Sequence, residues 1–264
     1  MENNLNNFEQ DLLNRKPLAE NLINIIEKSN DINVIAIDSA WGTGKTTFIK
    51  MWENMINTDE RYKDKFETLY FNAWENDYIK DPLLAFISEI AKQLNKDDGK
   101  LKKGLNHIKE YGKKLIKPLT VTGVRLLTHG ILDLEKFKFE EFTKNQINKL
   151  MGNISEISLQ EIVEDKETRS EFISELKNYI EKNNTNMIFF IDELDRCRPL
   201  FAIELLEVIK HLFNITGITF IISVDKEQLS HSISTLYGQN MDSDGYLRRF
   251  FDLEYKIPII NKEV

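Results

Sequence analysis

The sequence predicts an α/β fold built on an open parallel β-sheet. Short apolar runs have the composition of central strands that are covered on both faces; they occupy residues 34–37, 187–191 and 218–224. Amphipathic helical patterns alternate with these runs, at residues 18–28, 46–56 and 201–213. Strands that alternate with helices are typical of a parallel sheet with helices on both of its faces.

The remaining elements extend this pattern. A further strand is expected at residues 68–71, and a helix is expected from Asp81-Pro82, because Asp is a common N-cap and Pro is common at the first helical position. A helix at residues 168–182 would precede the strand at 187–191. Residues 251–257 alternate apolar and polar side chains before Pro258, which predicts a half-exposed edge strand.

Apolar spacing within the helical patterns predicts which side chains are buried. The predicted buried positions are Leu18, Leu22, Ile25 and Ile26 in the first helix, Phe48, Ile49, Trp52, Met55 and Ile56 in the second, and Leu205, Leu206, Ile209 and Leu212 in the last.

Residues 95–165 differ in character, with clustered lysines and a weak apolar pattern. We predict that residues 1–94 and 166–264 form the two parts of one core and that residues 95–165 are a helical insertion. The apolar stretch at 115–134 carries Lys117 and Arg125, and charges near the middle of a span are costly, so we expect no transmembrane segment.

Composition narrows the class further. The chain has 264 residues, 41% of them hydrophobic, and a formal net charge of -8, which argues against a protein that coats nucleic acid non-specifically. A single cysteine, Cys197, and a polar N-terminus without a signal sequence lead us to expect a cytoplasmic protein. The lysines from Lys96 to Lys117 are either a solvated face or a basic contact for nucleic acid or anionic lipid.

The segment Ser39-Ala40-Trp41-Gly42-Thr43-Gly44-Lys45-Thr46-Thr47 follows the first strand and opens the second helix. Gly42 and Gly44 permit a tight turn whose N–H groups bind phosphates at a helix N-terminus. Lys45 would reach the β- and γ-phosphates, and Thr46 would place its hydroxyl on Mg²⁺. Ser39 stands where the common pattern has another glycine. The sequence therefore predicts a P-loop nucleotide-binding site, with ATP and GTP both open.

Acidic residues follow the strand at 187–191. Asp192 would lie at the carboxyl edge of the sheet, where ligands bind, and is the candidate Mg²⁺ ligand. Glu193 is the candidate that orients or activates the attacking water. The alternative is a pair of acids that only cap the next helix.

Other polar groups are less specific. Ser223 and Asp225 end the third apolar strand, either next to the γ-phosphate or as an ordinary turn. Arg248 and Arg249 are candidates for stabilising the transferring phosphoryl group, in their own chain or in a neighbouring one, or are surface ion pairs. Asn95-Lys96-Asp97-Asp98 spells a guanine-recognition pattern but precedes the acidic strand, so we interpret it as chance.

Taken together, these residues resemble the KAP family of P-loop NTPases. The resemblance extends from about Arg15 to Pro258 and rests on Trp41-Gly42-Thr43-Gly44-Lys45-Thr46, Phe71-Asn72-Ala73-Trp74, Ile191-Asp192-Glu193-Leu194-Asp195-Arg196-Cys197, Ser223-Val224-Asp225 and Tyr246-Leu247-Arg248-Arg249.

The resemblance implies a parallel-sheet P-loop NTPase core of the additional-strand class, with the insertion between its Walker A and Walker B strands. It implies ATP and Mg²⁺ as cofactors, with Lys45 and Thr46 on phosphate and metal, Asp192 on metal and Glu193 on water. Bacterial relatives act in anti-phage defence and plasmid-borne exclusion. Relatives usually continue beyond the last strand, so we expect either a truncated chain or one domain of a longer protein.

Three functional hypotheses follow. The first is an ATPase that drives or times assembly as a homo-oligomer or with a partner protein. The second is a nucleotide-gated scaffold that hydrolyses ATP hardly at all. The third, a nucleotide or nucleic-acid kinase, has no recognisable acceptor site in the sequence.

Overall fold

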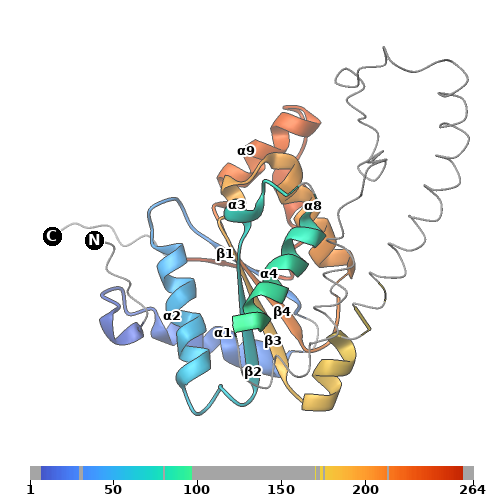
Figure 1. The fold of residues 1–264 in the computed structure, drawn as a ribbon. Coiled ribbons are helices and arrows are strands. Elements are labelled where there is room, and N and C mark those ends of the chain that lie inside the picture. The colour runs from blue at the N-terminus through green and yellow to red at the C-terminus, as the bar shows by residue number, and fades with distance from the viewer. Residues whose placement is uncertain are drawn as a thin grey trace, which may run out of the picture.

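The computed structural model describes residues 7–29, 32–79, 81–96, 170, 173–174, 176–212 and 214–257. They form a parallel sheet of five strands in the order β2-β3-β4-β1-β5 (Figure 1). The strands are β1 (Val34–Asp38), β2 (Phe66–Asn72), β3 (Asn186–Asp192), β4 (Ile218–Val224) and β5 (Leu253–Lys256). The predicted α/β fold and parallel sheet are confirmed.

Helices cover both faces of the sheet (Figure 1). On one face lie η1 (Phe8–Gln10), α1 (Lys16–Lys28) and α2 (Lys45–Thr58). On the other face lie α4 (Pro82–Lys96), α8 (Pro199–Leu212), α9 (Lys226–Tyr237) and the helical residues 176–183. Short helices follow two of the strands: α3 (Ala73–Asn76) follows β2, and η4 (Leu194–Arg196) follows β3. A third short helix, α10 (Ser243–Leu247), lies between α9 and β5.

Strand β4 is fully buried along its length, and its side chains alternate between the two hydrophobic layers. Ile221 packs with α1 and α2, whereas Phe220 and Ile222 pack with α4 and α8. This double burial explains why the central strands are continuous apolar runs. The half-exposed strand β5 forms one edge and pairs only with β1 among the described strands, as the alternating pattern predicted.

Helix α2 buries all the positions that its apolar spacing predicted, together with Met51 and Lys45. Trp52 packs against Phe48 in a tilted arrangement and against Phe190 edge to face, with ring centroids 5.6 Å and 5.5 Å apart. This packing fixes the helix against β3, so the helix N-terminus is held over the carboxyl edge of the sheet.

The prediction for helix α1 was partly wrong. Its buried residues are Ala19, Leu22, Ile23 and Ile26, whereas Ile25 is 38% exposed and Leu18 is half-buried. The buried set has the spacing i, i+3, i+4, i+7 of a single helical stripe, and Ile25 lies outside that stripe.

Helix α4 begins as predicted: the N–H of Leu83 donates to Asp81 Oδ1 at 2.9 Å. In α8, Leu205, Leu206 and Ile209 are buried, and the side chain of Leu212 is outside the described residues. The predicted insertion at 95–165 falls outside them beyond Lys96 and stays a prediction, as do the lysine-rich surface and the apolar stretch at 115–134. Within the residues that the structure describes, no helix has the length and apolarity needed to cross a membrane.

Candidate nucleotide-binding site

The glycine loop between β1 and α2 has the backbone geometry that an anion cradle needs. Gly42 and Gly44 adopt positive φ angles of 77° and 84°, which side chains disfavour. The Thr43 hydroxyl donates to the Ala40 carbonyl at 2.8 Å and closes the turn. A Cβ added at Gly42 would meet no atom within 4 Å, so the space in front of the loop is open.

Successive N–H groups of this loop are available to a ligand. No N–H of residues 40–47 donates a hydrogen bond to any residue that the structure describes. The set includes the first turn of α2, whose N–H groups have no acceptor within the helix. These groups and the helix dipole favour an anion, and phosphate is the ligand that such a loop suits.

Lys45 is buried, and its ammonium is held inside the loop. Its Nζ donates to the Ser39 carbonyl at 2.6 Å and to the Ala40 carbonyl at 3.2 Å. An ammonium group binds charged phosphate oxygens more strongly than it binds neutral carbonyls. Lys45 can therefore exchange the two carbonyls for a phosphate, and its ammonium stays hydrogen-bonded throughout.

Ser39 occupies the position of the usual first glycine without disturbing the loop. Its N–H donates to the Val224 carbonyl at 3.1 Å, which joins the start of the loop to the end of β4. Its hydroxyl is buried and has no hydrogen-bond partner among the described residues. The loop therefore accommodates a small side chain at this position.

Arg15 supports the loop from the N-terminal segment, a role that the sequence did not reveal. Its Nη1 donates to the Gly44 carbonyl at 3.0 Å, and its Nη2 pairs with Asp11 at 2.8 Å. Burial raises the pKa of Asp11, but the hydrogen bonds and charge of Arg15 outweigh it, and the net pKa is lowered.

Asp192 ends β3 and is almost completely buried at the carboxyl edge of the sheet. Tyr70 on β2 donates its hydroxyl to Asp192 Oδ2 at 3.0 Å, and the N–H of Glu193 donates to Oδ1 at 3.0 Å. Burial and the nearby charge of Asp192 raise the pKa of Tyr70, so the phenol stays a donor. These bonds fix the orientation of the carboxylate.

Glu193 has an unusual backbone and a restrained side chain. Its φ and ψ angles of 59° and 30° are left-handed, a conformation that is costly for a residue with a Cβ. Asn72 Nδ2 donates to Glu193 Oε2 at 3.1 Å, and Arg196 Nη1 pairs with Oε1 at 2.8 Å. Both carboxylate oxygens are therefore engaged.

The Asp195-Arg196-Cys197 signature surrounds Glu193 and the loop. The Asp195 carboxylate accepts a hydrogen bond from the Trp41 indole. The Arg196 guanidinium lies over the Trp74 ring, 5.8 Å from its centroid. The Cys197 thiol lies 3.6 Å from the Glu193 carbonyl oxygen, and burial raises its pKa, so it is an inert packing group.

The loop and the β3 end share one cavity of about 230 Å³. Its lining residues are Trp41, Gly42, Gly44, Lys45, Thr46, Asp192, Glu193, Asp195 and Arg196. One hydroxyl and one oriented carboxylate suit Mg²⁺, which takes oxygen ligands and keeps water and phosphate oxygens in its remaining positions. Thr46 and Asp192 therefore fit a magnesium ion held together with a nucleotide.

The remaining candidates lie apart from this cavity. Ser223 is fully buried, and its hydroxyl has no hydrogen-bond partner within the described part of the chain. Asp225 caps α9 by accepting from the N–H of Gln228. Arg248 and Arg249 are exposed, and Arg248 pairs with Asp244 at 2.8 Å. Arg248 lines a different cavity of about 530 Å³. Their catalytic assignment stays a prediction.

The position of β4 decides the class of the protein. It lies between β1, which leads into the glycine loop, and β3, which ends in Asp192. This is the sheet of a P-loop NTPase of the additional-strand class. The family model described as the KAP family P-loop domain matches residues 15–261, and the chain therefore belongs to that family.

Two curated proteins are similar to this chain. An uncharacterized protein of Methanocaldococcus jannaschii is 29% identical in an alignment of 174 residues that covers 59% of this chain and 88% of that protein. The Phage T7 exclusion protein of Escherichia coli (strain K12) is 22% identical over 232 residues, which are 86% of this chain but only 30% of the exclusion protein.

Two solved structures resemble the fold at 14% sequence identity. The ORC2 protein of Aeropyrum pernix, solved as ADPNP-ADP complexes, has a TM-score of 0.46; the match covers 97% of this chain and 52% of that one. CDC6P of Pyrobaculum aerophilum has a TM-score of 0.42, with 94% and 46% covered. This chain thus spans about half the length of these neighbours.

Proposed function

We propose that this chain is an Mg²⁺-dependent ATPase, a switch or motor unit within a larger assembly. One observation carries the proposal: Lys45 of the glycine loop and the acids Asp192 and Glu193 line the same cavity. Membership of the KAP family of P-loop NTPases supports nucleotide binding; ATP, Mg²⁺ and hydrolysis are our inference.

The proposed roles follow from the chemistry of each group. The free N–H groups of residues 40–47 and Lys45 hold the β- and γ-phosphates. Thr46 and Asp192 would hold Mg²⁺, which supplies charge neutralisation on the phosphate oxygens. Glu193, once released from its present partners, orients and deprotonates the attacking water.

ATP turnover of three variants tests this proposal. Lys45→Ala should lose ATP binding and turnover together. Glu193→Gln should keep ATP binding but lose turnover by about a hundredfold, within the usual range for a general base. The control is Glu181→Gln, because Glu181 is an exposed acid near the amino ends of the strands, away from the proposed site. If Glu193→Gln hydrolyses ATP as fast as the wild type, the role of Glu193 is wrong.

A nucleotide-gated scaffold with little hydrolysis is the second candidate. It is favoured by the engagement of both Glu193 oxygens, which restrains the group that would act on water. A wild type that assembles on adding ATP, with no turnover at any protein concentration, would establish the scaffold and exclude the ATPase.

The arginines suggest how an oligomer would complete the site. Arg248 and Arg249 are exposed and do not line the cavity, whereas Arg196 does. We therefore propose that Arg248 and Arg249 act on the nucleotide of a neighbouring subunit in a homo-oligomer. Turnover per molecule should then rise with protein concentration. A chain that carries Arg248→Ala and Arg249→Ala should regain turnover when it is mixed with Lys45→Ala, because the Lys45→Ala subunit still supplies the arginines. Mixing it with a chain that carries all three changes should restore no turnover.

The likeness to the Phage T7 exclusion protein suggests anti-phage defence in the cytoplasm as the setting. Nucleic-acid binding through Lys96–Lys117 and a partner protein are further proposals. Phage T7 should form fewer plaques on cells that express the protein, and Lys45→Ala should abolish this reduction. Equal plating with and without the protein would remove this setting.

A further inference from the structure

An exposed tryptophan of the glycine loop is bound to a buried carboxylate that lies 154 positions away in the sequence. Trp41 is 55% exposed, and its indole N–H donates to Asp195, which is 6% exposed. Asp195 belongs to the segment that carries Asp192 and Glu193. The hydrogen bond therefore joins the loop after β1 to the segment after β3.

This hydrogen bond, more than apolar packing, determines where Trp41 lies. Half of the indole faces solvent, and the following residue, Gly42, has no side chain and a positive φ angle. A glycine-rich loop loses much conformational freedom when it is fixed. A hydrogen bond to a carboxylate that is mostly buried is among the stronger bonds available for fixing it.

Asp195 also faces two other parts of the site. Burial raises the pKa of its carboxyl group, whereas Trp41, the charge of Lys45 and a backbone N–H of Asp225 act in the opposite direction. Asp225 follows β4, so the carboxylate lies where the segments after β1, β3 and β4 meet. The first two of these segments line the cavity.

We propose that Asp195 is a positioning residue that holds the phosphate-binding loop in its binding conformation through the Trp41 indole. Asp195 contributes to nucleotide affinity through Trp41 and leaves the chemical step to Glu193. The identity of the nucleotide as ATP rests on the function proposed above, whereas the coupling between Trp41 and Asp195 does not require hydrolysis.

The test is a double-mutant cycle on the affinity for Mg-ATP, measured by calorimetry. Trp41→Phe keeps a ring and removes the donor, and Asp195→Ala removes the acceptor. Each should weaken binding by about tenfold, which corresponds to about 1.4 kcal/mol. The double variant should bind no more weakly than the weaker single variant, because both changes remove the same bond.

Matched variants separate positioning from a general structural effect. Asp195→Asn keeps an acceptor for the indole and should bind ATP within about threefold of the wild type. Tyr78→Phe changes an exposed aromatic side chain that does not line the cavity and should leave affinity unchanged. In turnover assays, Trp41→Phe should raise KM while kcat at saturation stays within about twofold.

The proposal would be overturned if Trp41→Phe bound ATP with wild-type affinity, or if the loss of affinity in the double variant equalled the product of the two single losses. A fall in kcat without a change in KM for Trp41→Phe would also overturn it. If Asp195→Ala does not fold, the exposed Trp41→Phe still decides the question. A wild type that binds ATP without hydrolysing it refutes only the ATPase. A wild type that binds no nucleotide refutes both.

Discussion

Asn72, at the end of β2, donates its side-chain amide to the Glu193 carboxylate that follows β3, at 3.1 Å. Because Arg196 holds the other oxygen, the proposed water-activating group is restrained from two sides. We predict that Asn72→Ala removes one restraint and raises ATP turnover by about fivefold, since the loss of a hydrogen bond of about 1 kcal/mol changes a population by this factor. Steady-state turnover at saturating ATP measures the effect.

The neighbouring residue Asn76 provides the control. Its amide donates to the backbone carbonyl of Asn72 and does not reach Glu193, so Asn76→Ala should leave turnover unchanged. A fall in kcat for Asn72→Ala would mean that Asn72 holds Glu193 in its productive position instead.

The left-handed backbone conformation of Glu193 predicts that its side chain lowers the stability of the fold, although we propose that turnover requires its carboxylate. Glu193→Gly and Glu193→Ala both remove the carboxylate, but only glycine adopts this conformation without a Cβ penalty. Glu193→Gly should therefore be more stable than Glu193→Ala by about 1 kcal/mol, with turnover lost in both. Urea unfolding measures the difference, and equal unfolding free energies would show that the backbone relaxes without strain.

The open space at Gly42 predicts a change in binding that is separable from stability. Alanine at Gly42 or at Gly238 meets no atom within 4 Å, and both positions have positive φ angles. Each Gly→Ala change should destabilise folding by about 1 kcal/mol, since the strain is conformational. Only Gly42→Ala should also weaken ATP binding, because its Cβ enters the space predicted for phosphate. Equal ATP affinity in the two variants would place the phosphates elsewhere.

Much of the fold is predictable from the sequence because the central strands are buried on both faces. Residues 218–224 are all apolar or small, and they form β4 with the predicted bounds. Local patterns were less reliable where only one face is buried. Ile25 is apolar and lies near the buried stripe of α1, yet it faces solvent, and only the tertiary packing decides this.

Some of the residues that line the cavity were predictable, because they belong to sequence motifs with a specific chemical role. Lys45, Thr46, Asp192 and Glu193 do line one cavity, although their catalytic roles remain predictions. The supporting contacts of Arg15, Tyr70 and Asn72 were not predictable, because each depends on a three-dimensional approach between distant segments. The one available signal was that Asn72 and Asp192 each directly follow a predicted strand.

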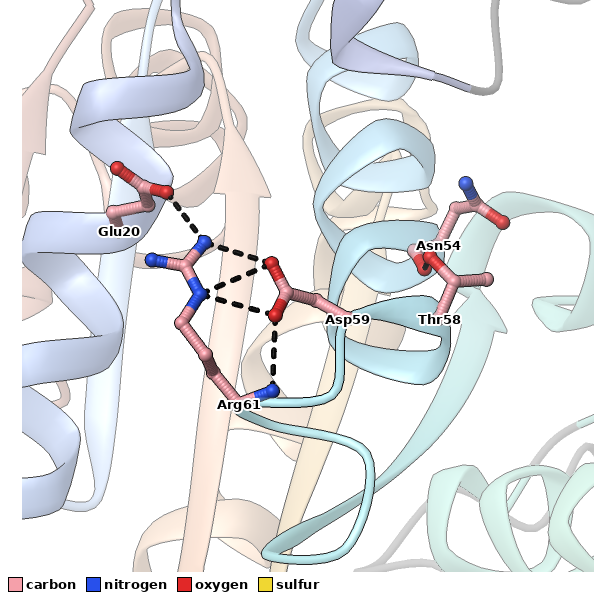
Figure 2. A network of polar contacts seen from close by, with 5 residues as sticks. All are labelled: Glu20, Asn54, Thr58, Asp59 and Arg61. Atoms are coloured by element: carbon pink, nitrogen blue, oxygen red, sulfur yellow. Dashed lines mark hydrogen bonds and ion pairs between the residues drawn. The ribbon is translucent and has the colours of Figure 1, made fainter.

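The turn after α2 predicts a specific pH dependence of stability. Arg61 donates to both carboxylate oxygens of Asp59 and to Glu20 of α1 (Figure 2). The hydrogen bonds from Arg61 lower the pKa of Asp59 to about 2. A carboxyl group whose pKa is lower in the folded state stabilises the fold at pH values above its unfolded pKa, about 3.9. That contribution is lost as the pH falls through about 2.

The comparison of the wild type with Asp59→Asn should therefore depend on pH. The variant should unfold at a lower urea concentration at about pH 5, and this deficit should shrink between about pH 4 and pH 2 as Asp59 is protonated in the wild type. Thr58→Ala, which removes a neutral bond of 2.8 Å to the Asn54 carbonyl in the same turn, should show a pH-independent difference (Figure 2). Parallel curves for the wild type and Asp59→Asn across this range would show that Arg61 gives Asp59 no net stabilisation, as is common for exposed ion pairs.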